Sequence, residues 1–148
     1  MIEMNDKFIR TSEEKIAAFE KGLGRPLPPQ YRQFLISYNG GRPKIDEFGI
    51  PGQGSSQANF FYGIDVGKDY KCYELKKNVD VLKGRIPNEL LPIADDPGGN
   101  QICISLSPDD CGRVYFWDHE KELEPDQTVI PLADSFDEFI DSLRESEE

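Results

Sequence analysis

The sequence predicts an α+β fold, with a twisted, mainly antiparallel sheet flanked by N-terminal, middle and C-terminal helices. In the second half of the chain, short strand-like segments follow one another after only a few residues, too few for the crossover that parallel strands need. Helical periodicity occurs near both ends and in the middle of the chain. A length of 148 residues suits one domain. We therefore expect a single domain over residues 1–148, with a core of about 11–145.

The first helix is expected to begin at Thr11, whose hydroxyl can cap it while Glu14 completes a capping box. Ile16, Phe19 and Leu23 supply the apolar side of this helix. Two glycines, at positions 22 and 24, are expected to end it.

The second helix follows a proline-rich connector, and Pro29 suits its first turn. Its apolar residues recur at the spacing of one helical face and are Tyr31, Phe34, Leu35 and Tyr38. Asn39-Gly40-Gly41 is expected to stop this helix. The spacing thus predicts one buried stripe.

The middle of the chain mixes a loop, a strand and a helix. Arg42–Asn59 is rich in glycine, proline, serine and glutamine and is expected to be a loop, with a short strand around Phe48. Phe60–Ile64 has the aromatic content of a strand. Tyr70–Leu82 is expected to form the third helix.

The second half of the chain is predicted to supply the main sheet. The expected strands are Leu91–Ala94, Gln101–Leu106, Arg113–Asp118 and Val129–Leu132. Polar and apolar residues alternate in Gln101–Leu106, as in a strand that is covered on one side. Ser135 is expected to cap a last helix, with Glu138 completing the box, and Arg144–Glu148 to form a frayed tail.

The charge balance favours a protein partner over nucleic acid or a membrane. With 17 basic and 28 acidic residues, the formal net charge is −11. Such a chain repels phosphate backbones and anionic membrane surfaces and meets a basic partner quickly. Many soluble proteins are also acidic, so charge alone leaves the question open.

The cysteines and the apolar runs indicate a cytoplasmic protein. Cys72, Cys103 and Cys111 are odd in number and match no metal or redox spacing, which suits a reducing compartment. The N-terminus has no apolar run of signal-peptide length, and no stretch approaches the ~20 apolar residues of a membrane helix.

No arrangement of residues predicts catalysis, a metal site or a cofactor. His119 is the only histidine, and the sequence has no G-x-S-x-G nucleophile elbow that could present a serine to it. The cysteines with His119 lack the close ligand pairs of structural zinc sites. Asp95, Asp96 and Asn100 lack calcium-loop spacing. The glycine-rich segment at 49–54 is a poor match to a phosphate-binding loop. A small-molecule role for the loop at 49–59 stays open.

Acidic turns and exposed aromatic residues are the best candidates for partner binding. The turns around the predicted strands are crowded with carboxylates, and Tyr and Trp are common interface anchors. The candidate residues are Asp95, Asp96, Asp109, Asp110, Tyr115, Trp117, Asp118 and Glu120. The alternative, that Tyr115 and Trp117 are core residues of a sheet buried on both sides, stays open.

The order of motifs resembles that of the SUKH superfamily, which includes yeast cell-wall-assembly regulators and many bacterial immunity proteins. Leu27–Leu35 followed by Tyr38–Gly41 is similar to the opening of that family. Leu91–Ala94, Gly98–Asn100 and Gly112–Glu120 are similar to its central core. The resemblance extends over about residues 11–145.

The resemblance implies an α+β fold and a binding protein without enzymatic activity. For a short member it implies an immunity protein that neutralises the toxin domain of a polymorphic toxin system, often a nuclease with a basic cleft. The closer similarity to a bacillus-type antitoxin implies a toxin of the LXG class. Two alternatives remain: a regulatory interaction domain like that of the yeast relatives, and an enzyme that uses Cys103 or His119.

Overall fold

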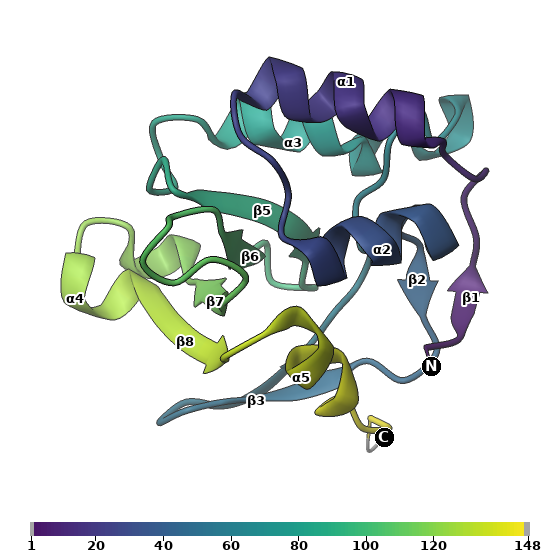
Figure 1. Ribbon diagram of the computed structural model, residues 1–148. Coiled ribbons are helices and arrows are strands. Elements are labelled where there is room, and N and C mark those ends of the chain that lie inside the picture. The colour runs from purple at the N-terminus through teal and green to yellow at the C-terminus, as the bar shows by residue number, and fades with distance from the viewer. Residues whose placement is uncertain (1, 147–148) are drawn as a thin grey trace.

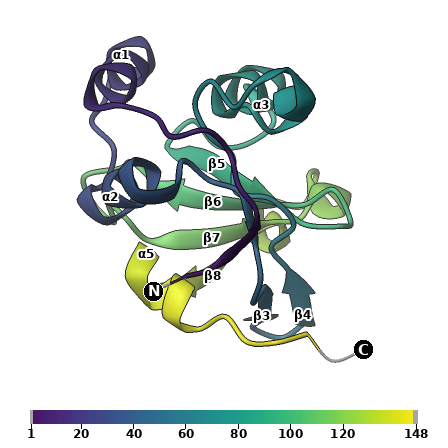
Figure 2. The same cartoon turned by 90° about the vertical axis from the view of Figure 1, so that its right-hand side faces the viewer.

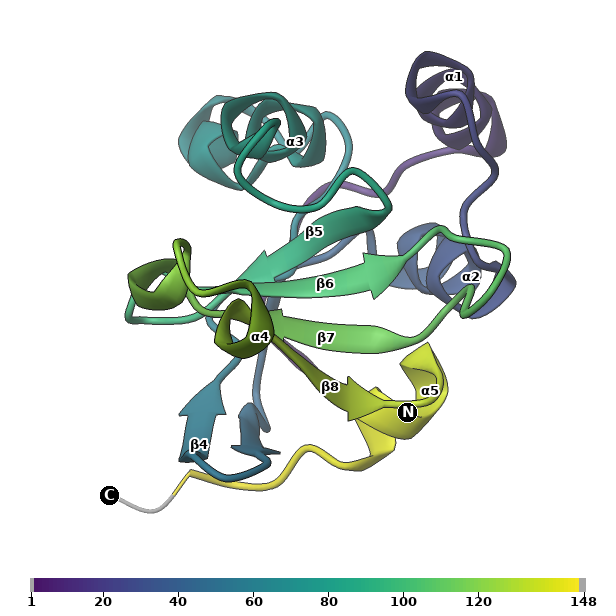
Figure 3. The ribbon, with the colours of Figure 1, turned by 90° about the vertical axis from the view of Figure 1, so that its left-hand side faces the viewer.

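A four-stranded antiparallel sheet organises the protein, whose computed structural model describes residues 2–146. Its strands lie in the order of the sequence, as Figure 3 shows. They are β5 (Leu90–Asp95), β6 (Gln101–Ser105), β7 (Val114–Trp117) and β8 (Val129–Ala133). The α+β prediction and the four predicted strands are confirmed, with small shifts at the strand ends.

One face of this sheet carries the main core. Ile102 pairs with Phe116 and Ile104 with Val114, so these apolar residues lie side by side on that face. Two helices pack on it, α2 (Pro29–Tyr38) and α5 (Phe136–Asp141), as Figure 1 shows. The aromatic rings of both helices join the same cluster. The second and the last of the predicted helices thus cover one side of the sheet.

The opposite face carries a smaller core at one end. Cys103 and Trp117 pack there against Leu82 and Ile86. Leu82 is the last residue of α3 (Leu75–Leu82), which lies beside β5 in Figure 3. The sheet is therefore buried on both sides where these residues meet.

The helix caps match the sequence closely except at the first helix, where the predicted Thr11–Glu14 capping box does not form and Gly22 lies inside the helix. Ser12, not Thr11, caps α1 (Glu13–Leu23), because Ser12 has extended backbone angles and its Oγ accepts the Lys15 N–H at 3.2 Å. Gly24 ends this helix in the left-handed region, as expected. The last-helix cap is confirmed, since the Ser135 Oγ accepts the Glu138 N–H.

The stop after α2 also ties distant segments together. Asn39 has a φ of 54°, and its side chain donates to the carbonyl oxygens of Ile9 and Ile64, each at 2.8 Å. A Cβ on Gly40 would lie 2.5 Å from the Phe61 carbonyl oxygen. This turn therefore requires the amide of Asn39 and the small size of Gly40.

Three segments in the middle and at the end of the chain differ from the predictions. In the expected loop at 42–59, β3 (Glu47–Ile50) confirms the short strand predicted around Phe48, but it pairs in a hairpin with β4 (Gly54–Gln57), which was not predicted (Figure 2). The predicted strand Phe60–Ile64 makes only isolated bridges. The predicted tail is not frayed at Arg144, whose N–H and C=O bond to Glu47. Residues 147–148 of that tail lie outside the described residues.

The third predicted helix is split into two. A 3₁₀ helix, η1 (Lys68–Tyr73), precedes α3, and Glu74 between them has extended angles. The Glu74 carboxylate accepts the backbone N–H groups of Asp65 and Val66, which holds it at the break. A periodicity argument misses this break because it depends on a contact with another segment.

Four short elements have no counterpart in the predictions. They are β1 (Met4–Asp6), β2 (Arg42–Pro43), the 3₁₀ helix η2 (His119–Lys121) and α4 (Pro125–Thr128). None exceeds four residues, which is too short for a periodic pattern to register.

Candidate partner-binding surface

The predicted binding residues lie at opposite ends of the sheet. Because β6 and β7 are antiparallel, Gln101 faces Trp117 at one end and Ile104 faces Val114 near the other. The turn with Asp95 and Asp96 and the segment Asp118–Glu120 share the first end, where the His119 N–H donates to the Asn100 side chain at 3.0 Å. The turn with Asp109 and Asp110 is at the second end. The eight residues do not form one surface.

Asp96 shapes its own turn. Its side chain is buried, and its carboxylate accepts the N–H groups of Gly98 at 3.0 Å and Asn100 at 2.7 Å. It also accepts from the Asn100 amide and from the Ser56 hydroxyl on β4. Both oxygens are thus occupied within the fold.

Asp95 is also engaged within the fold. It is half-buried and accepts the Phe60 N–H at 3.1 Å. Burial raises the pKa of Asp95 above the ordinary value, and the hydrogen bonds from Phe60 and Asn59 offset this only in part. Its role in the structure is to connect β5 with the Phe60 segment.

The residues that follow β7 divide into one buried and one exposed acid. Asp118 is buried and caps η2 by accepting the Glu120 N–H at 3.0 Å. The Glu120 side chain is exposed and makes no ion pair or hydrogen bond with the described residues. Glu120 therefore remains available at this end.

At the other end of the sheet Asp110 is bonded to the strands beside it. Its carboxylate accepts from the hydroxyls of Ser105 and Tyr115. Burial raises the pKa of Asp110, but these hydrogen bonds and the Arg113 charge outweigh it, so the pKa lies below the ordinary value. Asp109 beside it is exposed, without a side-chain partner among residues 2–146.

Of the two aromatic candidates, Trp117 belongs to the core and Tyr115 is half-buried. Only 1% of Trp117 is exposed, and its ring packs among Leu82, Ile86 and Cys103. The guanidinium of Arg85 lies 5.4 Å from the ring centroid and pairs with Glu122. Trp117 is therefore not accessible as a surface anchor, and the alternative interpretation is correct for this residue.

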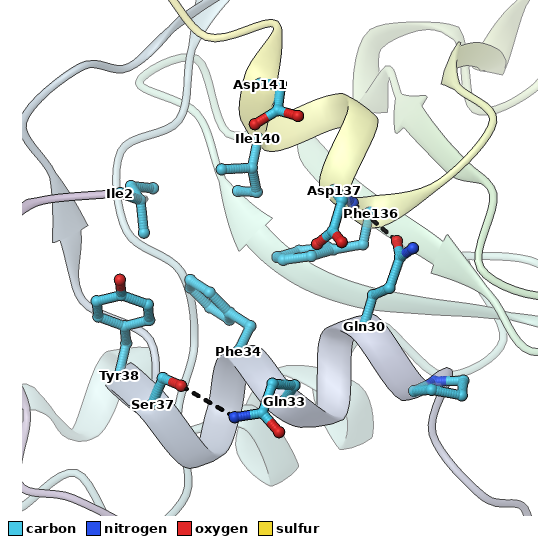
Figure 4. Close-up of a pocket in the computed structure, with 11 residues that line it drawn as sticks. Ile2, Gln30, Gln33, Phe34, Ser37, Tyr38, Phe136, Asp137, Ile140 and Asp141 are labelled. Carbon is cyan, nitrogen blue, oxygen red and sulfur yellow. Dashed lines mark hydrogen bonds between the residues drawn. The ribbon is translucent and has the colours of Figure 1, made fainter.

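A groove that the sequence does not predict lies between α2 and α5. It encloses about 520 Å³, within the range of pockets that hold small ligands, and Figure 4 shows its lining. The residues that line it are Ile2, Pro29, Gln30, Gln33, Phe34, Ser37, Tyr38, Phe136, Asp137, Ile140 and Asp141. The sequence feature that could have pointed to this groove is the pair of acids four residues apart in the last helix, Asp137 and Asp141.

The base of the groove is apolar and its helices are joined by a hydrogen bond. The rings of Phe34 and Phe136 are in contact at a tilt, with centroids 5.0 Å apart and an angle of 55° between the ring planes (Figure 4). The Gln30 Oε1 accepts the Asp137 N–H at 2.9 Å, which links α2 to the first turn of α5. On α2, the Gln33 amide donates to the Ser37 hydroxyl at 3.2 Å.

The rim of the groove carries negative charge. Asp137 and Asp141 are exposed, and the lining includes no lysine, arginine or histidine. A neighbouring depression of about 410 Å³ shares Asp141 and includes Lys44, whose ammonium pairs with Glu3 at 3.5 Å. Neither groove carboxylate forms an ion pair among the described residues.

Other chemistry is not assembled in the part of the chain that the structure describes. Residues 2–146 hold no group of three or more His, Cys, Asp or Glu placed to bind a metal ion. Burial raises the pKa of the Cys103 thiol, while Cys72 and Cys111 are exposed and unpaired. Within these residues no helix has the length and apolar character to cross a membrane.

Comparisons with known proteins agree with the fold. Residues 10–142 match the SMI1 / KNR4 family (SUKH-1). A relative in Bacillus subtilis (strain 168), described as SPbeta prophage-derived uncharacterized protein YokK, is 31% identical over an alignment of 150 residues, gaps included, that spans 89% of this chain and 74% of the relative. The chain belongs to the SMI1 / KNR4 (SUKH-1) family.

Proposed function

We propose that this protein is an immunity protein, or antitoxin, that binds and neutralises the toxin domain of a bacterial polymorphic toxin, a basic nuclease. It acts in the cytoplasm, by binding and without an enzymatic step. Membership of the SUKH-1 family supports the class of function, because the family includes immunity proteins. A toxin of the LXG class is the partner that the sequence resemblance favours.

The observation that carries the proposal is the acidic surface. The net charge of −11 includes exposed carboxylates that make no bond within the described fold, such as Asp109, Glu120 and Asp137. A nuclease presents a basic cleft to its polyanionic substrate. An acidic protein is steered to that cleft and competes with nucleic acid for it.

The test is co-expression with the toxin domain encoded by the adjacent gene. We expect cells that produce both proteins to grow, and the two to co-purify as a complex. Association should slow as salt is raised, because screening weakens steering. Unrelieved toxicity together with no complex would disprove the proposal. A toxin domain with a disabled active site serves as the binding partner when the active form is too toxic.

A further inference from the structure

We propose that the α2–α5 groove docks a basic segment of the toxin, with one apolar side chain inserted against Phe34 and Phe136. Lysine or arginine residues beside that side chain pair with Asp137 and Asp141. This inference rests on the proposed function and assigns it a surface. The chemistry of the occupant follows from the base and the rim of the groove.

The base of the groove selects an apolar side chain. Phe34 and Phe136 lie beneath it, and Ile2, Tyr38 and Ile140 are half-buried along its sides. Figure 4 shows these side chains converging from α2, α5 and the N-terminal segment. Apolar surface inside a concave site becomes favourable when a partner excludes water from it.

The rim selects positive charge beside that side chain. Asp137 and Asp141 are four residues apart and thus lie on the same side of α5, where like charges repel. Elsewhere on the protein, the exposed Glu13 and the half-buried Glu47 are paired with arginine, whereas Asp109 and Glu120 are also without a partner among the described residues. The groove acids lack such a partner among residues 2–146, and cations from the toxin would supply it.

The α2 side of the groove offers hydrogen bonds to a peptide backbone. Gln30 uses its carbonyl oxygen to hold Asp137, and its NH₂ group has no partner among the described residues. That group can donate to a backbone carbonyl of the docked segment. Gln33 and Ser37 are bonded to each other and form a polar border. An extended segment fits this arrangement of apolar base, acidic edge and amide edge.

The experiment compares two double charge reversals of equal size. Asp137→Lys with Asp141→Lys changes the groove, and Glu89→Lys with Glu124→Lys changes two exposed acids outside it. Titration calorimetry with the catalytically disabled toxin domain measures Kd for each. We expect the groove variant to weaken binding about 100-fold, as for charge pairs at an interface centre. The control variant should weaken it only a few-fold, through its effect on net charge.

Two milder variants keep the test valid if the reversal disturbs α5. Asp137→Asn with Asp141→Asn removes the charge and retains side-chain size, and Ser37→Trp fills the groove while leaving both acids in place. Each should weaken toxin binding about 10-fold or more. Circular dichroism and thermal unfolding identify any variant that fails to fold.

The outcomes distinguish a wrong assignment of the groove from a wrong assignment of the antitoxin role. If the wild-type protein binds the toxin and the groove variants bind equally well, the groove assignment is wrong and the antitoxin role stands. A control variant that weakens binding as much as the groove variant also overturns the assignment. If the wild-type protein binds no toxin, both proposals fail. A wild-type dimer that the groove variants dissociate would show that a second copy is the occupant.

Discussion

The carboxylates of Asp95, Asp96, Asp110 and Asp118 at the ends of the sheet differ from those on the rim of the α2–α5 groove in what occupies their oxygens. Asp96 accepts from Gly98, Asn100 and Ser56, and Asp110 accepts from two hydroxyls. Asp137 and Asp141 have no side-chain partner among the described residues. The first group builds turns, and the second is open to an external cation.

The comparison shows that adjacent acids in a turn are a poor guide to which carboxylates are free. The turns at 95–100 and 107–112 each carry two adjacent acids, yet the carboxylates of Asp95, Asp96 and Asp110 are used within the fold. An acid already bonded to backbone N–H groups must break those bonds before it can pair with a partner. Acids without internal partners avoid that cost.

The largest expected effect concerns Trp117, the most buried of the residues that the sequence predicts to bind a partner. Trp117→Ala should lower the free energy of unfolding by about 3–5 kcal/mol, since it removes a large ring from the small core with Leu82, Ile86 and Cys103. Urea denaturation measures this, and Trp117→Phe should cost much less. A loss of partner binding with full stability would restore Trp117 as an anchor and break the comparison.

Asp96→Ala is expected to have the next largest effect. It leaves the N–H groups of Gly98 and Asn100 without their acceptor, at a cost of about 2–4 kcal/mol in the free energy of unfolding. Asp96→Asn keeps one oxygen and should lose about half as much. Amide exchange at Gly98 and Asn100 would report the opened turn. Wild-type stability of the alanine variant would argue that Asp96 is free for a partner.

Asp110 should make stability depend on acid pH. Because its pKa is lower in the folded state than in the unfolded state, its contribution is complete above the ordinary carboxyl pKa of about 4. That contribution is lost as the pH falls through the folded-state pKa. Asp110→Asn should cost about 1–2 kcal/mol at neutral pH and flatten the loss of stability below about pH 4.

Asp95 supplies the control for this pH experiment. Its pKa is raised in the folded state, so its favourable contribution is present at low pH and is lost as the pH rises through that raised pKa. Asp95→Asn should therefore change the pH profile of unfolding in the opposite sense. Identical profiles for the two variants would contradict the different bonding that the structure assigns to these acids.

The smallest effect on stability is expected at the groove. Asp141 is the last residue of α5, where a negative charge opposes the helix dipole, and Asp137 repels it from one turn away. Asp141→Asn should raise the free energy of unfolding by about 0.5 kcal/mol while weakening toxin binding. Glu138→Gln, on the same helix but outside the groove lining, is the matched control for binding. Destabilisation by Asp141→Asn would place this acid with those that build the fold.

Much of the fold was predictable because its signals are local. The spacing of Tyr31, Phe34 and Leu35, the proline that begins α2 and the serine that caps α5 each act within a few residues. The strands β5 to β8 were predictable from alternation and from turn residues. The break before α3 and the β3–β4 hairpin were missed, because the contacts that hold Glu74 and the pairing of Glu47 with Gln57 lie beyond a helical or strand period.

For the candidate site as well, some properties follow from the local sequence and others only from the packing of distant segments. Residue types and their order determined that the chain is acidic, that its sheet is antiparallel and that its motifs are those of the SUKH-1 family. Only the tertiary structure decided which acids are free, because hydrogen bonds between segments such as Ser56 and Asp96 cannot be read from composition. It alone brought Phe34 and Asp137 together, since a groove exists only where two distant helices pack side by side.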